Sequence, residues 1–301
     1  MNNILITGAS GLIGTRLTEM LLLKGHQVSH LGRSKKSGSI KSFTWNVDLQ
    51  QMDENALQGI DTIIHLAGAG VADKRWTEKR KQEILESRTR STQLLFYALK
   101  KGNHQVTTFV SASAIGYYGF ESNEELTEKS LAGNDFLANV TRQWEEEVGK
   151  IESLNIRVAK IRIGIVLSEK GGALKEMMLP VKFFVGAPLG SGNQYLSWIH
   201  IDDLCSMFCK AVEDKNMRGA YNGVGTHPVT NRALTRAIAK VLGRPMFLAP
   251  IPNFIMKVII GEMADIVLGG SKVSSSKIQQ AGFSFQFDTL DKALRDLLVR
   301  N

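Results

Sequence analysis

A strand, a glycine-rich turn and a helix follow one another at the start of this chain. The apolar run Asn3–Thr7 predicts a strand, and the run Leu12–Lys24 predicts a helix that ends at Gly25. Between them the glycines have the spacing Gly-x-x-Gly-x-x-Gly. A diphosphate needs main chain close to it without intervening Cβ atoms, and the positive end of a helix favours it. In this context the pattern predicts a dinucleotide site, with a purely structural turn as the alternative; its residues are Gly8, Ser10, Gly11, Leu12, Ile13 and Gly14.

Alternating apolar and amphipathic runs fill the first half of the chain. Strands are predicted at Asn3–Thr7, Gln27–Leu31, Ser42–Trp45, Asp61–Leu66, Thr108–Ser111 and Arg157–Ile163, and helices at Leu12–Lys24, Glu78–Lys101 and Phe136–Leu154. Strands separated by helices predict an α/β fold of the Rossmann kind, a doubly wound parallel sheet with helices on both faces.

The pattern changes after Leu167, where closely spaced glycines indicate a long irregular region. A strand at Leu196–Ile201 and helices at Asp203–Glu213, at Asn231–Leu242 and from Thr289 are expected beyond it. We therefore expect a Rossmann domain at residues 1–167, to which 196–225 return. Residues 168–195 and 226–301 would form a smaller, mostly helical substrate-binding lobe.

Composition excludes several classes of protein. The 301 residues carry a net charge of +8, but the basic residues are dispersed and no nucleic-acid-binding motif is present, so no nucleic-acid partner is expected. No secretory signal is visible, and the apolar stretch 247–267 is interrupted by charges, so no membrane span is expected. The two cysteines, Cys205 and Cys209, fall on one helix face and indicate reduced core thiols. These features favour a cytoplasmic location.

The residues after the second predicted strand indicate which dinucleotide binds. An NAD-binding protein usually carries Asp or Glu there, but this chain has Gly32-Arg33-Ser34-Lys35-Lys36. A guanidinium can pair with a 2′-phosphate that a carboxylate would repel. Arg33 and Ser34 therefore predict NADP(H) as the cofactor, with simple solvent exposure of Arg33 as the alternative. The small residues after His65 would let the cofactor lie against the strand ends, at Leu66, Ala67 and Gly68; His65 itself is expected to be a packed core residue.

Taken together, these residues resemble the extended short-chain dehydrogenase/reductase superfamily, within an atypical subgroup of sugar-nucleotide epimerase-like "epimerase family" proteins with a C-terminal domain of unknown function. The matching segments are the glycine loop, 65–69, 72–77, 111–119, Trp144-Glu145, Arg162 with Gly164, 190–192, 194–203, 221–225, 268–270 and 281–283. The resemblance implies hydride transfer to or from a small molecule, such as a nucleotide sugar. Homodimers are frequent among such proteins, and a dimer is one option here.

The resemblance breaks at the catalytic dyad. Ser113 matches the superfamily's serine, but the Tyr-x-x-x-Lys pair expected about 25 residues later is missing, since Leu131 to Gly149 contains neither residue type. Tyr117 and Tyr118 are candidates to carry the proton instead. The substrate, which would be anionic if the basic residues contact it, is expected near Lys74, Arg75, Trp76 and Tyr195; no metal is expected. Two functions stay open: an NADP-dependent oxidoreductase or epimerase-like enzyme, and a non-catalytic NADP(H)-binding regulatory or sensor protein.

Overall fold

An eight-stranded sheet forms the centre of the molecule in a computed structural model that describes residues 1–35, 38–120, 124–246 and 249–299. Its strand order is β12-β8-β6-β5-β1-β2-β3-β4, and every neighbouring pair is parallel except β3–β4. The bounds are β1 Asn3–Thr7, β2 Gln27–Gly32, β3 Lys41–Asn46, β4 Gln51–Met52, β5 Thr62–His65, β6 Thr108–Ala114, β8 Arg157–Ile163 and β12 Gly219–Gly223. The Rossmann-type α/β fold is therefore confirmed.

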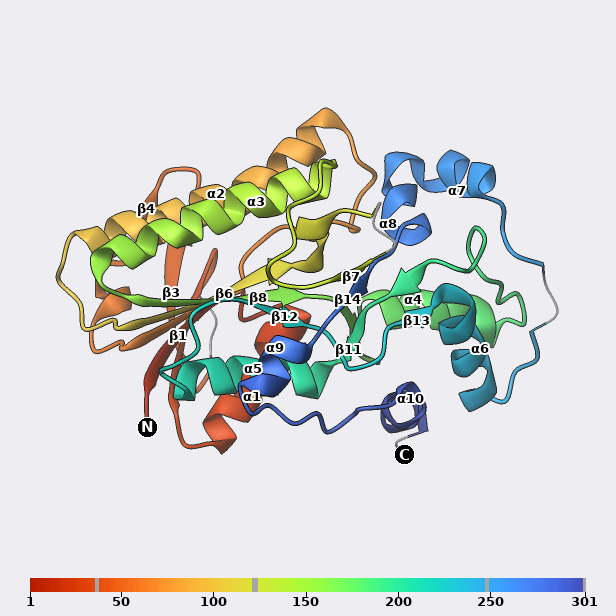
Figure 1. The fold of residues 1–301 in the computed structure, drawn as a ribbon. Helices are drawn as coiled ribbons and strands as arrows, with labels where there is room; N and C mark the ends of the chain where they lie inside the picture. Colours follow the sequence, from red (N-terminus) through yellow and green to blue (C-terminus); the bar gives the residue numbers. More distant parts are fainter. Residues whose placement is uncertain (36–37, 121–123, 247–248, 300–301) are drawn as a thin grey trace.

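The chain reverses its direction of winding between β1 and β5. From β1 it proceeds through β2 and β3 to one edge of the sheet, and from β5 it proceeds through β6, β8 and β12 to the other. Helices α1 (Leu12–Leu23) and α5 (Ile201–Glu213) cover one face, and α2 (Glu78–Lys100) and α3 (Phe136–Gly149) cover the opposite one (Figure 1). In open sheets of this kind ligands bind at the carboxyl ends of the strands, beside the reversal point. The site is therefore expected at the ends of β1 and β5.

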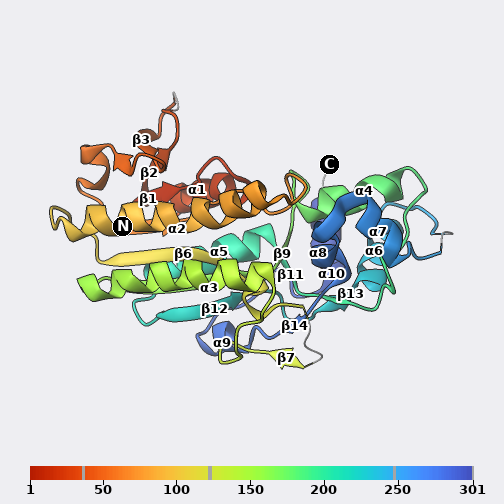
Figure 2. The same cartoon turned by 90° about the horizontal axis from the view of Figure 1, so that it is seen from above.

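The later part of the chain adds a cluster of helices at one end of the sheet (Figure 2). They are α4 (Ala173–Lys182), α6 (Asn231–Val241), α7 (Asn253–Ile260), α8 (Ala264–Leu268) and α10 (Leu290–Val299). Short strand pairs accompany them: β11 (Trp198–His200) with β9 (Ile165–Leu167), β10 (Tyr195–Leu196) with β13 (Val229–Thr230), and β14 (Lys272–Val273) with β7 (Glu125–Leu126). Short helices occur at η1 Glu54–Leu57, η2 Ile115–Tyr118, η3 Lys150–Leu154, η4 Gly261–Met263 and α9 Ser276–Gln280.

The second half differs from its predicted elements in two places. Helix α4 lies inside the stretch expected to be irregular, where the glycine density obscured its periodicity. The predicted strand at 196–201 is divided between β10 and β11, and it ends at His200 because that imidazole accepts a hydrogen bond from the Asp202 N–H and caps α5. Of residues 196–225, β12 and α5 lie on the large sheet, while β11 pairs outside it. The proposed division into two lobes stays a prediction.

No helix in the described ranges is both long and apolar enough to cross a membrane. Within the same ranges, no cluster of three or more His, Cys, Asp or Glu side chains could hold a metal ion.

Candidate functional site

The glycine loop lies where β1 ends and α1 begins. Gly8 has a φ of +68°, and a Cβ there would lie 2.8 Å from the Leu66 carbonyl carbon, so Gly8 permits both the turn and the approach of the chain after β5. Gly14 packs against the loop itself, since a Cβ there would lie 2.6 Å from the Ala9 Cα. No side chain caps α1 at Gly11, and no acidic residue occupies its first turn. The first N–H groups of α1 are therefore available to an anion.

A cavity of about 870 Å³ opens in front of this loop. Its floor is the glycine loop, one wall follows the end of β2, another follows the residues after β5, and side chains of α2 close it. The predicted cofactor residues that line it are Gly8, Ser10, Gly11, Arg33, Ser34, Leu66, Ala67 and Gly68. The structure thus brings the loop, the basic segment and the small residues after β5 into one cleft.

The end of β2 presents no carboxylate to this cavity. Arg33 and Ser34 follow the strand directly and are exposed, as is Lys35. Lys36 lies outside the described residues. Among the described residues, the acidic side chains that line the cavity lie on other segments, at Asp48, Glu83 and Glu86.

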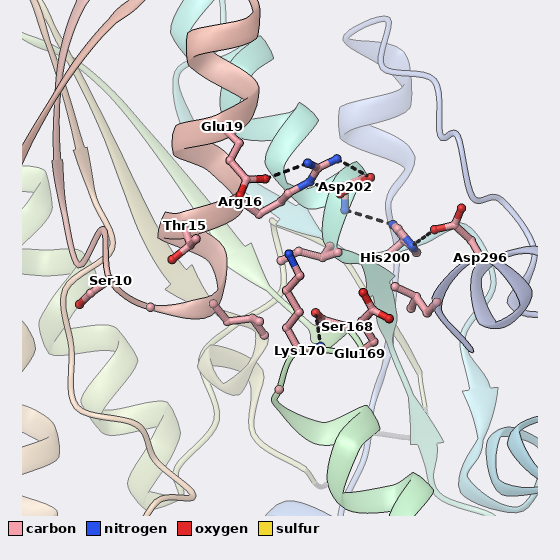
Figure 3. Close-up of a pocket in the computed structure, with 15 residues that line it drawn as sticks. Ser10, Thr15, Arg16, Glu19, Ser168, Glu169, Lys170, His200, Asp202 and Asp296 are labelled. Carbon is pink, nitrogen blue, oxygen red and sulfur yellow. Dashed lines mark hydrogen bonds and ion pairs between the residues drawn. The ribbon is translucent and has the colours of Figure 1, made fainter. Parts of the chain in front are cut away.

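A second cavity of about 410 Å³ shares Ser10 and Gly11 with the first and lies on the other side of the start of α1. Leu12 lines it, together with the loop after β9 and the start of α5. Figure 3 shows a chain of polar groups on its wall: Arg16 binds Asp202 through two hydrogen bonds of 2.7 and 3.0 Å, and His200 lies 3.3 Å from Asp296. Lys170, from the loop after β9, also lines this cavity. The sequence did not indicate a role for Arg16, Lys170 or Asp296, because no local motif distinguishes them.

Ser113 lies at the end of β6 inside a buried network. Its hydroxyl donates to Glu145 Oε1 at 2.6 Å, and Glu145 accepts two further bonds from Arg162, at 2.8 and 2.9 Å. Ser113 and Arg162 are register partners on β6 and β8, and Glu145 reaches them from α3. An ion pair therefore lies beside the serine in a protein whose α3 lacks both Tyr and Lys.

For both Glu145 and Arg162, burial and ion pairing shift the pKa in opposite directions. Burial raises the pKa of Glu145, but the Arg162 guanidinium and the Ser113 hydroxyl outweigh it, so the pKa lies below its ordinary value. Burial disfavours the charged Arg162, yet its bonds to Glu145 raise the pKa of the guanidinium overall. Both groups are therefore charged at neutral pH.

The two candidate tyrosines differ in how their hydroxyls are used. Tyr118 is buried, donates to Asn222 Oδ1 at 2.7 Å and accepts from Arg162 at 2.9 Å; burial is the main reason that its pKa is raised. Tyr117 is half-buried, and the Arg162 guanidinium lies 3.5 Å from its ring centroid. Within the described part of the chain, the Tyr117 hydroxyl makes no hydrogen bond. Only Tyr117 therefore keeps its hydroxyl available.

The predicted substrate residues fall in separate places. Lys74 and Arg75 are exposed, and Arg75 donates to the carbonyl of Val258 on α7 at 3.4 Å. Trp76 packs edge-on against Phe136 at the start of α3, with ring centroids 4.9 Å apart. Tyr195 lies on β10, with Lys272 Nζ 4.2 Å from its ring centroid. Their role in substrate binding stays a prediction.

Comparisons with known proteins agree with this architecture. Residues 4–138 match the NAD dependent epimerase/dehydratase family, and residues 251–297 match a domain of unknown function (DUF1731). Epimerase family protein YfhF of Bacillus subtilis is 37% identical over 99% of this chain and 98% of its own length. The Arabidopsis thaliana protein named "Epimerase family protein SDR39U1 homolog, chloroplastic" is 37% identical over 97% of this chain and 86% of its own length.

Solved structures give the same result. The crystal structure of human epimerase family protein SDR39U1 (isoform2) with NADPH superimposes with a TM-score of 0.88 at 30% identity, over 99% of this chain and 100% of that one. A nucleoside-diphosphate sugar epimerase from Corynebacterium glutamicum gives a TM-score of 0.80 at 30% identity, over 99% of this chain and 58% of that one. This chain therefore belongs to the NAD dependent epimerase/dehydratase family, among the epimerase family proteins that end in this domain of unknown function.

Proposed function

We propose that this protein binds NADP(H) in the 870 Å³ cavity and uses it to exchange hydride with a small molecule. Two features of the cavity carry the proposal. An uncapped helix N-terminus lies at one end, and Arg33 and Ser34 lie at another, where no described residue of the segment after β2 is acidic. The NADPH in the crystal structure of the human relative supports the same cofactor.

The residues present fit this cofactor. The N–H groups at the start of α1 would receive the diphosphate, since a Cβ at Gly8 or Gly14 would fill the space in which the turn is folded. Arg33 and Ser34 would hold the 2′-phosphate, and Leu66 to Gly68 would form the wall beside the ribose. When bound, the nicotinamide supplies the hydride chemistry.

The proton that accompanies hydride transfer needs a different carrier from the usual dyad. We assign it to Tyr117, whose hydroxyl is available while that of Tyr118 is bonded on both sides. Ser113 would hold Glu145, and through it Arg162, in position beside Tyr117. This role is additional to the substrate contact that the sequence predicts for Ser113. The Arg162 guanidinium under the Tyr117 ring would stabilise negative charge that develops on the phenol oxygen.

Replacing Arg33 by alanine is expected to weaken NADPH binding by about 10- to 100-fold and to leave NADH binding within about twofold. The loss corresponds to a charge-assisted bidentate contact with the 2′-phosphate, which NADH lacks. Isothermal titration of both nucleotides measures this. Arg142→Ala, at an exposed guanidinium on α3, is the matched control. An unchanged ratio of the two dissociation constants would remove Arg33 from the site.

A non-catalytic NADP(H)-binding regulator or sensor is the second candidate. It is favoured by one specific observation: the Ser113 hydroxyl donates to Glu145 and lies buried, although the superfamily resemblance implies a substrate contact for it. Bound cofactor would then act by stabilising one state of the protein.

Turnover separates the two candidates. With NADPH and a panel of carbonyl compounds and nucleotide sugars, we expect consumption of NADPH that Tyr117→Phe lowers by at least about 100-fold, because a lost general acid typically costs that much. NADPH affinity should stay the same in this variant. Absorbance of the reduced nicotinamide and a parallel binding titration provide the two measurements. A wild-type protein that binds NADPH but turns over no member of the panel would favour the regulator.

A further inference from the structure

Arg88 lies on α2, which runs beside α3 (Figure 1). The proposed function gives this cation no role. Its side chain passes directly behind Gly68, where a Cβ would lie 3.2 Å from the Arg88 Cζ. The absence of a side chain at Gly68 therefore makes room for Arg88 as well as for a cofactor. The guanidinium donates to the Ile84 carbonyl at 2.9 Å and lies 3.5 Å from Ser87 Oγ.

No carboxylate in the described ranges pairs with Arg88. None forms a salt bridge with it, and its two hydrogen-bond acceptors are a carbonyl and a hydroxyl. Burial, and secondly the charge of Arg80, two turns earlier on α2, lower the pKa of Arg88 to about 10. A partly buried cation without a counter-charge is costly in a folded protein.

The groups around Arg88 are hydrogen-bond donors that lack acceptors. The Arg88 Cζ lies 5.3 Å from the centroid of the Trp144 ring, and Trp144 Nε1 is buried without a partner. The indole side chain is only 5% exposed. Arg80 is buried and pairs with Glu83 and Asp73, but its Nε has no partner. A cation and unsatisfied N–H groups in one place are the complement of an anion.

This cluster adjoins the proposed cofactor cavity. Gly68 and Ser87, which both lie beside the guanidinium, line the 870 Å³ cavity. Ser87 also accepts a hydrogen bond from the Ala69 N–H, which fixes the chain after β5 against α2. An anionic group at the end of β5 would therefore lie next to Arg88.

We propose that Arg88 and Trp144 Nε1 receive a phosphoryl or carboxylate oxygen of a bound small molecule at the end of β5. The oxygen would accept hydrogen bonds from both groups and supply the negative charge that Arg88 lacks among the described residues. It can come from the cofactor or from the substrate, since each would pass this point. The site does not depend on the identity of the cofactor, because free phosphate has the same chemistry.

Arg88→Met tests the proposal through stability. Methionine keeps much of the volume of the side chain and removes the charge, so the ligand-free variant should melt at a temperature equal to or above that of the wild type. Inorganic phosphate or pyrophosphate, without any nucleotide, should raise the melting temperature of the wild type by at least about 3 °C at saturation. The rise should be clearly smaller in the variant, which keeps only the diphosphate site at the start of α1. Arg142→Met, at an exposed arginine, should respond as the wild type does.

Trp144→Phe is a second variant, which keeps an aromatic ring but removes the indole N–H together with part of the ring. Its melting temperature without ligand should fall because the side chain is buried and becomes smaller, and the rise that pyrophosphate causes above that value should be smaller than in the wild type. If pyrophosphate raises the melting temperature of R88M or W144F as much as that of the wild type, the proposal is wrong. A lower melting temperature for ligand-free R88M would also overturn it, since Arg88 would then be structural.

NADPH titrations identify the source of the oxygen. A loss of NADPH affinity of about tenfold or more in R88M, with no further effect of phosphate on the NADPH-loaded wild type, assigns the oxygen to the cofactor. Unchanged NADPH affinity in R88M, with phosphate still stabilising the NADPH-loaded wild type, assigns it to the substrate. Failure of the wild type to bind NADPH, with its pyrophosphate effect intact, would contradict the proposed function and leave the anion site standing.

Discussion

Replacing Glu145 by alanine is expected to lower the free energy of unfolding by about 3–5 kcal/mol. The two side chains of the Glu145–Arg162 pair are only 8% and 5% exposed, so the variant would leave a buried guanidinium without its counter-charge. Lys160 Nζ, 3.7 Å from Glu145 Oε2, would lose the same partner. The Ser113 hydroxyl would also lose its acceptor. Urea unfolding of the two proteins measures the difference.

A neighbouring glutamate is the matched control. Glu146 pairs with Arg142 at 2.9 Å on the outer face of the same helix, where both side chains are about half exposed. Glu146→Ala should therefore cost no more than about 0.5 kcal/mol. The double variant Glu145→Leu, Arg162→Met should recover most of the lost stability, because apolar residues of similar volume remove both charges together. If E145A and E146A lowered the free energy of unfolding equally, the buried Glu145–Arg162 pair would not make the expected contribution to stability.

This ion pair bears on the proposed hydride transfer. In the resemblance that the sequence suggested, a tyrosine and a lysine at the start of this helix would serve the serine, whereas here a glutamate and an arginine surround it. A charged pair that is fixed by Ser113 and Tyr118 cannot easily exchange a proton, since the pKa of Glu145 is lowered and that of Arg162 is raised. The pair is therefore suited to hold Tyr117 and to present charge, rather than to act as an acid or base.

The parts of the fold that the sequence predicted well are those with local causes. β1 and β8 have the predicted bounds, and α1 starts at the predicted residue, because a strand, a tight turn and a helix each depend on a few consecutive residues. The placement of Arg33 beside the glycine loop also followed from local spacing, since β1 and β2 are neighbours in a parallel sheet.

The parts that could not be predicted depend on contacts between distant residues. Glu145 reaches Ser113 across 32 positions and Arg162 across 17, and no pattern in the helix distinguishes it from Glu146. From the sequence alone, Arg88 is one of several basic residues on an amphipathic helix, and only the structure shows that it lies behind Gly68. Lys170 faces the start of α1 only because the chain returns after β9. Such placements follow from topology, which local periodicity does not encode.

His65 was expected to be a packed core residue, and this is confirmed, since it is fully buried at the end of β5. Its Nδ1 lies 2.7 Å from the Thr7 hydroxyl, and its Nε2 lies 3.2 Å from that of Thr92. Thr7 Oγ1 already accepts N–H bonds from Leu66 and Ala67, so its own proton points to the ring. The network therefore assigns a neutral imidazole with its proton on Nε2.

Acid should unfold this protein through His65. Burial, and secondly the charge of Arg88, lower the pKa of His65 from 6.5 to about 3. Below the pKa of His65 in the unfolded chain, the unfolded chain binds a proton at this residue but the folded protein does not. The contribution of His65 to stability is therefore fully present above that pKa and is lost as the pH falls below it. Between about pH 7 and pH 5 the loss should be about 2 kcal/mol, before most carboxylates titrate. Urea unfolding across this range measures it.

The variant His65→Gln should flatten this dependence, because an amide keeps a donor and an acceptor but does not titrate. His227→Gln, at an exposed histidine, is the control and should keep the wild-type slope. A wild type whose stability is constant over the range would contradict the assignment of His65. Because Arg88 contributes to the low pKa, an anion bound beside it should ease protonation of His65, and saturating pyrophosphate should therefore make the acid dependence of the wild type shallower. That change links the buried histidine beneath the glycine loop to the proposed anion site, and R88M should abolish it.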